Sequence, residues 1–409
     1  MRAEAGSWND RGVARSSEVA APASRRGEAL RAVGLPAVAA ALFATVFVVR
    51  RVVSVESGDV SGNVLIGRLN APGRVPGDLS VLSGPGYDGQ FYYRLAVDPF
   101  HLDGLTNGIR IDSPVRLQRI GYPFLSWLLS GGQSSVVPFA LVLVNVLAVG
   151  ALAGLGAALA CSYGRAPAWG LLFGVFSGFV VTLARDLTEL LAAALVVGAL
   201  LALRRERPVT AGIVLAGAVL TRETALILPV AVLLASLRGG RWRAGFRPRR
   251  ADLVWLLPVI AYVLWQGAVR LLTGHLPARA EHDNLSVPLV AAARSVAKAF
   301  GQAPLHDVVF VFAVAALVIL VVIVVLAAAR RPGRVPRPVL YAFGLSTVLT
   351  ASLSRNVWNG DAAELRTFMD VHLFGVAALM AAPPRYLVAY GVVTAAPFVL
   401  AVVYYSGSL

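Results

Sequence analysis

Long apolar runs recur along this chain from Ala32 onward, and they constrain its fold more than any other feature. A run of roughly 17–25 residues is the length that an α-helix needs to cross the hydrocarbon core of a bilayer. Charged residues make up only 14% of the chain, whereas a soluble globular protein carries about 25%. The runs are continuous rather than alternating, which excludes a transmembrane β-barrel. The sequence therefore predicts an all-α integral membrane protein.

We expect about eleven transmembrane helices, some of them short enough to need a thinner bilayer or neighbouring helices. A hydrophilic segment, residues 50–135, separates the first two spans and forms a large first loop. Within it, residues 119–129 have too few apolar side chains to cross, and we interpret them as a juxtamembrane or re-entrant helix. The expected spans are residues 32–49, 136–160, 168–184, 187–203, 208–220, 225–237, 253–272, 308–329, 339–353, 366–382 and 386–405.

Basic residues set the expected orientation of the chain. The 37 lysines and arginines against 22 acidic residues give a net charge of +15, which would suit a nucleic-acid partner. These cations instead fall in short clusters between apolar runs, as in cytoplasmic loops of membrane proteins, so we expect no nucleic-acid binding. With the clusters 204–207, 238–250 and 330–337 in the cytoplasm, residues 1–31 form a disordered basic cytoplasmic tail and residues 50–135 an extracytoplasmic loop. The predicted location is the cell membrane, crossed many times.

Asp88 lies in an unusual stretch of the first loop, between Gly86 and Gly89 and close to three tyrosines. Glycine allows a backbone to approach a ligand closely, and tyrosine and arginine side chains suit sugars and phosphates. We therefore predict that Asp88 is the catalytic acid/base of an active site at the membrane surface. The alternative is a simple turn, because Asp-Gly is a common turn dipeptide.

Three more segments predicted on the outer side carry charged residues beside the ends of spans. Arginines at helix N-termini favour phosphate binding, and charges at the mouth of a helix bundle are functional candidates. The acids in the first two turns also fit a capping box or a dipole-favoured first turn, and this alternative stays open. The candidates are Arg185, Asp186 and Glu189 in the first turn, Arg222 and Glu223 in the second, and Arg355, Glu364 and Arg366 in a later loop.

Four motifs together resemble the GT-C superfamily of polytopic glycosyltransferases. They are Tyr-Asp-Gly-Gln-Phe-Tyr-Tyr at 87–93, Arg-Ile-Gly-Tyr-Pro-Phe-Leu at 119–125, Arg-Asp-Leu-Thr-Glu at 185–189 and Leu-Thr-Arg-Glu-Thr-Ala at 220–225. The resemblance implies a GT-C-like catalytic membrane module over residues 32–237, followed by a C-terminal helical membrane region over 238–409. It also implies a polyprenyl-phosphate-linked sugar as donor and Asp88 as the general base.

The same resemblance implies roles for the other candidates. Arg119, Arg185 and Arg222 would bind the phosphate of the leaving group, and Tyr92 and Tyr93 would line the sugar pocket. A divalent cation bridging Asp88, Asp186 and the phosphate is an option, although the sequence shows no dedicated metal site. The expected partners are the lipid-linked donor and membrane lipids. The full substrate-binding set is Tyr87, Gln90, Tyr92, Tyr93, Arg119, Arg185, Asp186, Glu189, Arg222, Glu223, Arg355, Glu364 and Arg366.

Two other classes of protein remain open from the sequence. A transporter or flippase needs ionisable residues midway along its spans, whereas here they lie at the membrane edges. A non-catalytic envelope protein would spread its acids and arginines over the outer surface. The transferase hypothesis makes the opposite prediction, that Asp88, Arg119, Asp186 and Arg222 face one lipid-accessible cavity.

Overall fold

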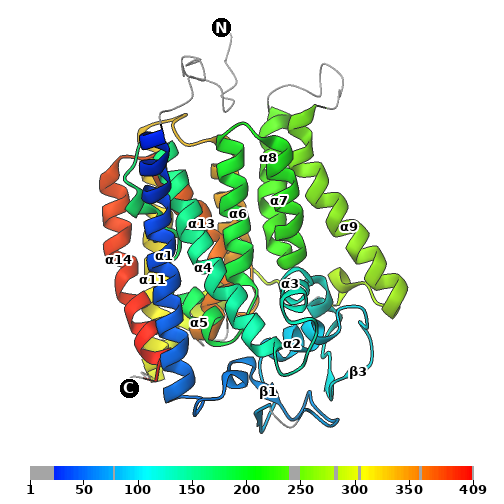
Figure 1. Cartoon of the computed structure of the whole chain (residues 1–409). Helices are drawn as coiled ribbons and strands as arrows, with labels where there is room; N and C mark the ends of the chain where they lie inside the picture. Colours follow the sequence, from blue (N-terminus) through cyan, green and yellow to red (C-terminus); the bar gives the residue numbers. More distant parts are fainter. Residues whose placement is uncertain are drawn as a thin grey trace.

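The computed structural model describes residues 23–76, 79–238, 249–280, 284–302, 305–358 and 362–407, which form fourteen α-helices, most of them packed lengthwise into one bundle (Figure 1). The α-helices are α1 (Ala23–Ser54), α2 (Gly89–Val97), α3 (Gly121–Ser130), α4 (Val137–Ser162), α5 (Ser177–Ala184), α6 (Glu189–Arg204), α7 (Pro208–Thr221), α8 (Ile227–Arg238), α9 (Leu253–Thr273), α10 (Val290–Gln302), α11 (Leu305–Arg330), α12 (Arg337–Ala351), α13 (Met369–Met380) and α14 (Pro384–Tyr405). The 3-10 helices are η1 (Val60–Val64), η2 (Pro114–Gln118), η3 (Pro167–Phe173), η4 (Glu223–Leu226), η5 (Arg250–Asp252), η6 (Pro277–Arg279) and η7 (Ala362–Phe368). The strands are β1 (Ile66–Gly67), β2 (Val81–Leu82), β3 (Leu105–Thr106) and β4 (Ile109–Arg110).

The helices fit an all-α membrane protein. Among the described residues, five helical segments are long and apolar enough to cross a bilayer, and the bent pair of η3 and α5, at 66° to one another, makes a sixth if it counts as one span. The remaining expected spans are helical but shorter, so the crossing number of eleven stays a prediction. The ten residues of α3 reach only about 15 Å, which is too short to cross.

The expected disordered tail ends earlier than we predicted. Helix α1 already begins at Ala23, so residues 23–31 continue the first span instead of belonging to a disordered segment. The physical reason is that alanine, leucine, arginine and glutamate in this stretch all favour helix. Residues 1–22 of the expected tail, and most of the basic cluster 238–250, lie outside the described residues.

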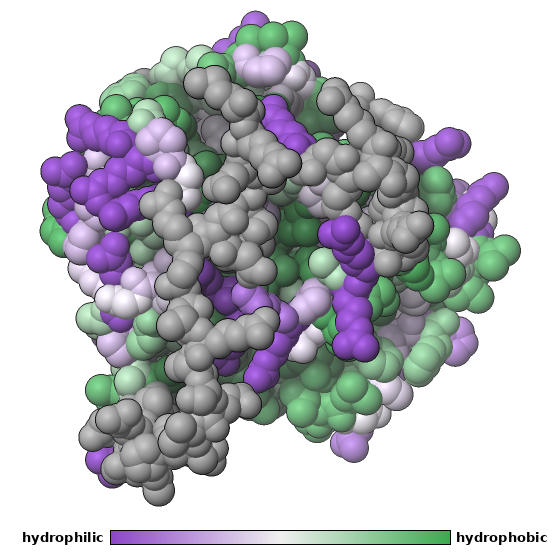
Figure 2. Space-filling model, turned by 90° about the horizontal axis from the view of Figure 1, so that it is seen from above, coloured by the Kyte–Doolittle hydropathy of each residue, from purple (hydrophilic) through white to green (hydrophobic). Residues whose placement is uncertain are grey.

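The two ends of the bundle differ. The first loop, with β1, β3, α2 and α3, lies at the end where the chain finishes; we call this the loop end (Figure 1). The opposite end carries the turn between α6 and α7, and hydrophilic side chains gather there above hydrophobic flanks (Figure 2). This distribution agrees with polar residues leaving the membrane at that end, while the orientation of the chain stays a prediction.

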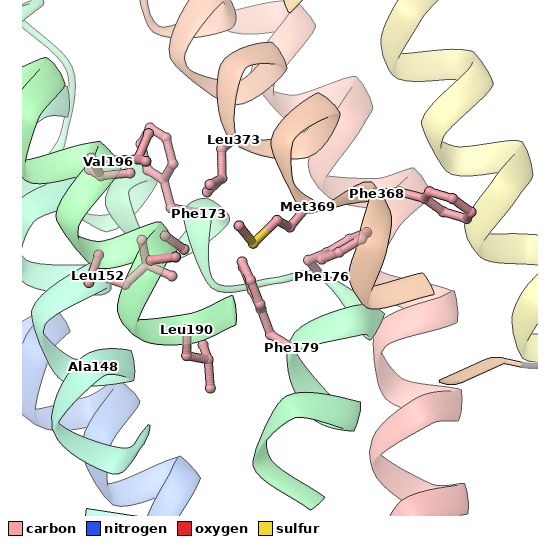
Figure 3. Packing of buried hydrophobic residues seen from close by; sticks show 14 of the residues in the cluster. Ala148, Leu152, Phe173, Phe176, Phe179, Leu190, Val196, Phe368, Met369 and Leu373 are labelled. Carbon is pink, nitrogen blue, oxygen red and sulfur yellow. The ribbon is translucent and has the colours of Figure 1, made fainter. Parts of the chain in front are cut away.

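A cluster of large apolar side chains fills the centre of the bundle. Phe173, Phe176 and Phe179 of the bent pair pack with Leu152 of α4 and Met369 of α13 (Figure 3). Every residue of α13 is buried, so this helix is the central one. Because α13 is enclosed over its whole length, the η7 segment directly before it is held firmly at the loop end.

The first loop is ordered around α2. The fully buried Arg94 donates hydrogen bonds to four backbone carbonyls, those of His101, Asp103, Gly104 and Ile109. These bonds tie the β3–β4 hairpin to α2, because a buried guanidinium must have its donors satisfied. The loop therefore presents the start of α2 as a fixed platform.

Candidate active site

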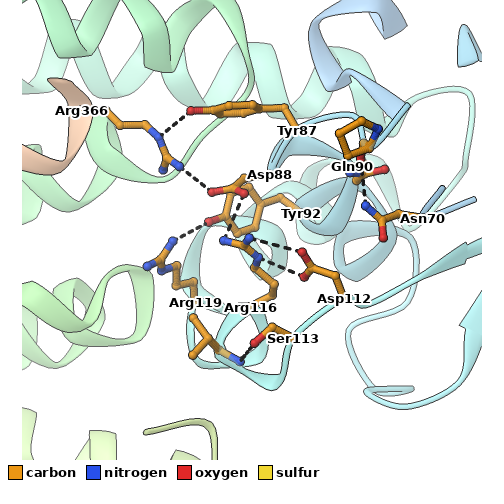
Figure 4. A network of polar contacts seen from close by, with 12 residues as sticks. Asn70, Tyr87, Asp88, Gln90, Tyr92, Asp112, Ser113, Arg116, Arg119 and Arg366 are labelled. Carbon is orange, nitrogen blue, oxygen red and sulfur yellow. Dashed lines mark hydrogen bonds and ion pairs between the residues drawn. The ribbon is translucent and has the colours of Figure 1, made fainter. Parts of the chain in front are cut away.

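Asp88 lies at the start of α2, but its side chain does not cap the helix. It occupies the N-cap position in a helical conformation, without a side-chain capping bond. Its carboxylate is buried and faces two guanidinium groups instead (Figure 4). Arg366 Nη2 lies 2.7 Å from Oδ2, and Arg116 Nη1 lies 3.1 Å from Oδ1. The turn alternative therefore does not account for the Asp88 carboxylate.

Arg366 joins Asp88 to a second acid from a distant segment. Its Nη1 atom lies 2.7 Å from Oε1 of Glu189, and its Nε donates to the hydroxyl of Tyr87 over 3.1 Å. Glu189 also accepts from Nη1 of Arg222. The first turn of α6, the end of α7, the start of α2 and η7 thus share one buried ion-pair network.

Arg119 forms a second pair beside this network. Its Nε and Nη2 atoms donate to the two carboxylate oxygens of Glu223 over 2.9 and 2.6 Å, a bidentate arrangement. Its Nη1 donates to the hydroxyl of Tyr92 over 3.2 Å. The first residue of η4 is thereby linked to the residue that directly follows η2.

A polar cavity of about 660 Å³ opens at the loop end beside these pairs. Its volume lies within the range of roughly 300–1,000 Å³ that is typical of small-molecule sites. Four arginines and two acids line it, so the wall is strongly charged. The lining residues are Tyr87, Asp88, Arg116, Arg119, Arg222, Ala280, Asn284, Asn356, Val357, Glu364, Arg366 and Thr367.

The arginines keep the acids of the site ionised. Burial opposes ionisation of Asp88, but the charges of Arg366, Arg116 and Arg119 outweigh it and hold the pKa of Asp88 well below its usual range. Burial is likewise outweighed at Glu223, where Arg119 lowers the pKa to about 2. Each guanidinium of the cavity wall is thus already paired with a carboxylate, and an incoming anion has to compete with it.

Most of the residues expected from the sequence meet in this site. Three of the four residues predicted to face one cavity, Asp88, Arg119 and Arg222, do so. Tyr87, Glu364 and Arg366 also line the cavity, and Glu189, Glu223 and Tyr92 bind residues that line it. The cavity draws on both expected regions of the chain, since Arg366 and Glu364 lie beyond residue 237.

Gln90 and Tyr93 do not line the cavity. Gln90 accepts a hydrogen bond from the backbone N–H of Gly67 and donates one to the carbonyl of Pro85, which fixes the loop. Tyr93 is fully buried, with its hydroxyl donating to the carbonyl of Ser134. Both point away from the cavity because neighbouring residues of a helix face different directions. Their expected role in substrate binding stays a prediction that this cavity does not support.

Arg185 and Asp186 also fall outside the cavity wall. The guanidinium of Arg185 stacks on the ring of Tyr87, 4.3 Å from its centre. Asp186 is fully buried, neither of its carboxylate oxygens has a hydrogen-bond partner among the described residues, and burial, opposed only by Arg51, raises its pKa. Both oxygens of Asp88 are bound by guanidinium groups, so the residues present do not fit a cation bridging Asp88 and Asp186.

The structure has Glu189 and Glu223 in the first turns of α6 and η4, as the dipole alternative expects, but it does not have the side-chain capping bonds. Thr188, at the N-cap of α6, makes no side-chain capping bond, and Glu189 turns to arginines. Thr221 donates back to the carbonyl of Gly217 within α7 instead of capping the next turn. The described residues contain no group of three or more His, Cys, Asp or Glu side chains suited to a metal ion.

Arg116 is the main residue of the site that the sequence prediction omitted. It lines the cavity and pairs with both Asp88 and Asp112. The signal that could have found it is its position three residues before Arg119, since this spacing brings two side chains to one face of a helical turn. Asn284, Asn356 and Thr367 were also missed, and nothing in their local sequence singles them out.

The comparisons with protein-family models, with curated proteins and with solved structures returned no match. All four motifs that resemble GT-C enzymes contribute a side chain to the cavity or to its ion pairs, through Asp88, Arg119, Glu189, and Arg222 with Glu223.

Gly89 is required by packing, which gives a first prediction. A Cβ at this position would lie 2.6 Å from the carbonyl oxygen of Arg185 and 2.7 Å from that of Val64. Gly89→Ala is thus expected to lower the free energy of unfolding by about 1–3 kcal/mol through overpacking. Gly267→Ala in α9, where nothing lies within 4 Å, is the control and should be neutral or stabilising. Thermal unfolding of the purified variants measures both, and equal stability of the two would contradict the close packing.

Proposed function

We propose that the chain is a membrane glycosyltransferase that moves a sugar from a polyprenyl-phosphate donor to an acceptor at the extracytoplasmic face. The observation that carries the proposal is a buried carboxylate, Asp88, facing a cavity lined by four arginines from three separate segments. Such a wall suits a substrate with a phosphate at the reacting centre. The resemblance of the four motifs to GT-C enzymes supports the same reaction.

In the proposed reaction, Asp88 takes a proton from the acceptor's hydroxyl or amine. The nucleophile attacks the anomeric carbon, the bond from that carbon to the phosphate oxygen breaks, and polyprenyl phosphate leaves with the electron pair. A positioned carboxylate base accelerates such a step by about 10²–10⁴-fold. Arg119, Arg222 and Arg366 would stabilise the charge that develops on the phosphate.

An apolar groove supports a lipid-linked donor. It has a volume of about 520 Å³ and is lined mainly by aliphatic side chains of α3, α4, α6 and α7. Leu125 and Leu129 at one end belong to α3, which begins two residues after Arg119. A phosphate at Arg119 would thus lie beside a helix that leads into an apolar groove suited to a prenyl chain. A soluble nucleotide sugar would have no use for this groove.

The position of the charges favours a transferase over a transporter. The ionisable residues that line the cavity lie in the first loop, directly after α7 and in η7, and none lies within one of the five long apolar helices of the described chain. Alternating access needs such groups midway along the spans. Within α13, His372 is bound to the hydroxyl of Tyr390 and to carbonyls of η3, which is a packing role. A scaffold protein, in turn, has no need to concentrate four guanidinium groups on one cavity.

A transfer assay tests the proposal. The purified protein in lipid nanodiscs is incubated with polyprenyl-phosphate sugars labelled in the sugar, together with envelope lipids and glycans as acceptors. Label in an acceptor with release of an equal amount of polyprenyl phosphate is expected. Label that only changes sides of a liposome membrane, with no polyprenyl phosphate released, would contradict the proposal in favour of a flippase.

The pH dependence of transfer follows from the ion pairs of Asp88. Because arginines lower its pKa, Asp88 stays ionised at neutral pH. Protonation of Asp88 should therefore not lower the kcat/KM of the wild type above about pH 5. Arg116→Gln removes one cation, which raises the pKa, so protonation should begin to inactivate the variant at higher pH than the wild type. Arg110→Gln, on the exposed end of β4, is the control. Identical acid limbs for Arg116→Gln and wild type would contradict this role of Arg116.

A further inference from the structure

A second cavity adjoins the proposed active site. It has a volume of about 340 Å³, and Ser286, Arg294, Ser354, Arg355 and Asn356 supply its polar lining. Asn356 lines both this cavity and the larger one that holds Asp88, so the two meet at this residue. Neither the reaction step nor the donor groove described above uses the smaller cavity.

Hydrogen bonds between two distant segments build this second cavity. The backbone N–H groups of Ser286 and Leu289 donate to the carbonyls of Ser352 and Ala351, both over 2.7 Å. The N–H of Ser354 donates to the carbonyl of Asn284 over 2.9 Å. The start of α10 is thereby held against the end of α12, and a bond from the Ser295 hydroxyl to the carbonyl of Trp358 closes the arrangement. Arg294 and Arg355 are brought to one wall.

Arg294 and Arg355 differ from the arginines of the larger cavity in their ion pairs. Arg116, Arg119, Arg222 and Arg366 each form an ion pair with a carboxylate, whereas neither Arg294 nor Arg355 does so in the part of the chain that the structure describes. Two guanidinium groups in one hollow, with the hydroxyl of Ser354 beside them, present many donors and a positive charge that no carboxylate of the described residues pairs. The Ser286 hydroxyl already donates to the carbonyl of Leu353. This chemistry is that of an oxyanion site.

We propose that the second cavity binds a phosphate or carboxylate group of the acceptor substrate. The proposal rests on the transferase function above and adds the chemical class of the acceptor, an anionic glycan or lipid. With its anionic group between Arg294 and Arg355, the acceptor extends past Asn356 into the larger cavity. Its nucleophile then reaches Asp88 while the donor phosphate occupies the arginines there.

Two measurements test the proposal at the level of the site and of the reaction. Phenylglyoxal modifies accessible arginines, and mass spectrometry reports each position in the purified full chain. Inorganic phosphate is expected to protect Arg294 and Arg355, both exposed, while the exposed Arg68 and Arg74 of the first loop stay reactive. Equal reactivity of all four with and without phosphate would overturn the anion site.

Kinetics then assign the anion to the acceptor. Arg294→Gln with Arg355→Gln should raise the acceptor KM about tenfold or more and leave the donor KM and the kcat at saturating acceptor unchanged. A rise in the donor KM instead would overturn the proposal and assign the cavity to the donor. Protection by phosphate without any sugar transfer in the wild type would retain an anion site, overturn its assignment to an acceptor and refute the transferase function.

Discussion

Asp88→Asn is expected to slow sugar transfer by about 10²–10⁴-fold, because asparagine keeps the shape of the side chain but cannot accept the proton. The fold should survive the change. Arg366 keeps its bond to Glu189, and Arg116 keeps its pair with Asp112, so neither guanidinium loses all its acidic partners. Steady-state kinetics with the labelled donor measure the effect, and donor binding measured in parallel separates chemistry from affinity.

Asp112→Asn is the matched control for this experiment. Asp112 also pairs with Arg116, at 3.2 Å, yet it is not among the residues that line the cavity. Its amide variant should therefore transfer sugar at a rate close to that of the wild type. If Asp88→Asn retained wild-type transfer, or if both variants lost it equally, Asp88 would not be the base.

Arg366→Gln is expected to cause the largest loss of stability among single substitutions in the site. Arg366 is buried and joins Asp88 and Glu189, so its removal leaves each of these carboxylates with a single cation, Arg116 and Arg222 respectively. Removing one partner of a buried ion pair typically costs about 3–5 kcal/mol, because the remaining charge stays desolvated. Thermal unfolding in one detergent should show a clear fall in Tm.

A double-mutant cycle separates the pair from general damage. Glu189→Gln in the Arg366→Gln background removes one of the carboxylates left underpaired, so the double variant should lose less stability than the sum of the two single variants. Arg68→Gln, exposed in the first loop, is the control and should stay within about 0.5 kcal/mol of the wild type. Strictly additive losses would show that Arg366 and Glu189 are not coupled.

The membrane character of the fold was predictable from local sequence. The long helices α1, α4, α9, α11 and α14 coincide with apolar runs that bilayer thickness alone identifies. The shorter α5, α6, α7, α8, α12 and α13 were also expected as helical segments. Whether each crosses the bilayer depends on packing and tilt, which local hydropathy does not contain.

The site was predictable in its residue types more than in its contacts. The glycines and tyrosines around Asp88 pointed to that residue, charges beside span ends pointed to Arg222 and Arg366, and the resemblance pointed to Arg119. The bond between Arg366 and Asp88 joins residues 278 positions apart, and nothing in one sequence fixes such a pairing. The sequence also does not fix the direction in which α2 docks: neither Tyr92 nor Tyr93 lines the cavity, and Tyr92 reaches the site only through its bond with Arg119.

The glycines beside Asp88 illustrate a different limit. The sequence indicated that they allow close approach of a backbone, and the structure has such an approach. The neighbour is the chain itself, because a Cβ at Gly89 would meet the carbonyl oxygens of Arg185 and Val64. The composition of this stretch indicates that a glycine is needed for close packing, but it does not identify the group that packs against the glycine.

The proposed reaction requires that the arginine-lined cavity holds the phosphate of a lipid-linked sugar with its anomeric carbon beside Asp88. An electron cryomicroscopy structure of the full chain with a non-hydrolysable polyprenyl-phosphonate sugar tests this directly. We expect phosphonate oxygens within hydrogen-bond distance of Arg119, Arg222 or Arg366, the sugar against Asp88, and the prenyl chain in the groove between α3, α4, α6 and α7. Density for the headgroup at the opposite end of the bundle, remote from Asp88, would contradict this requirement.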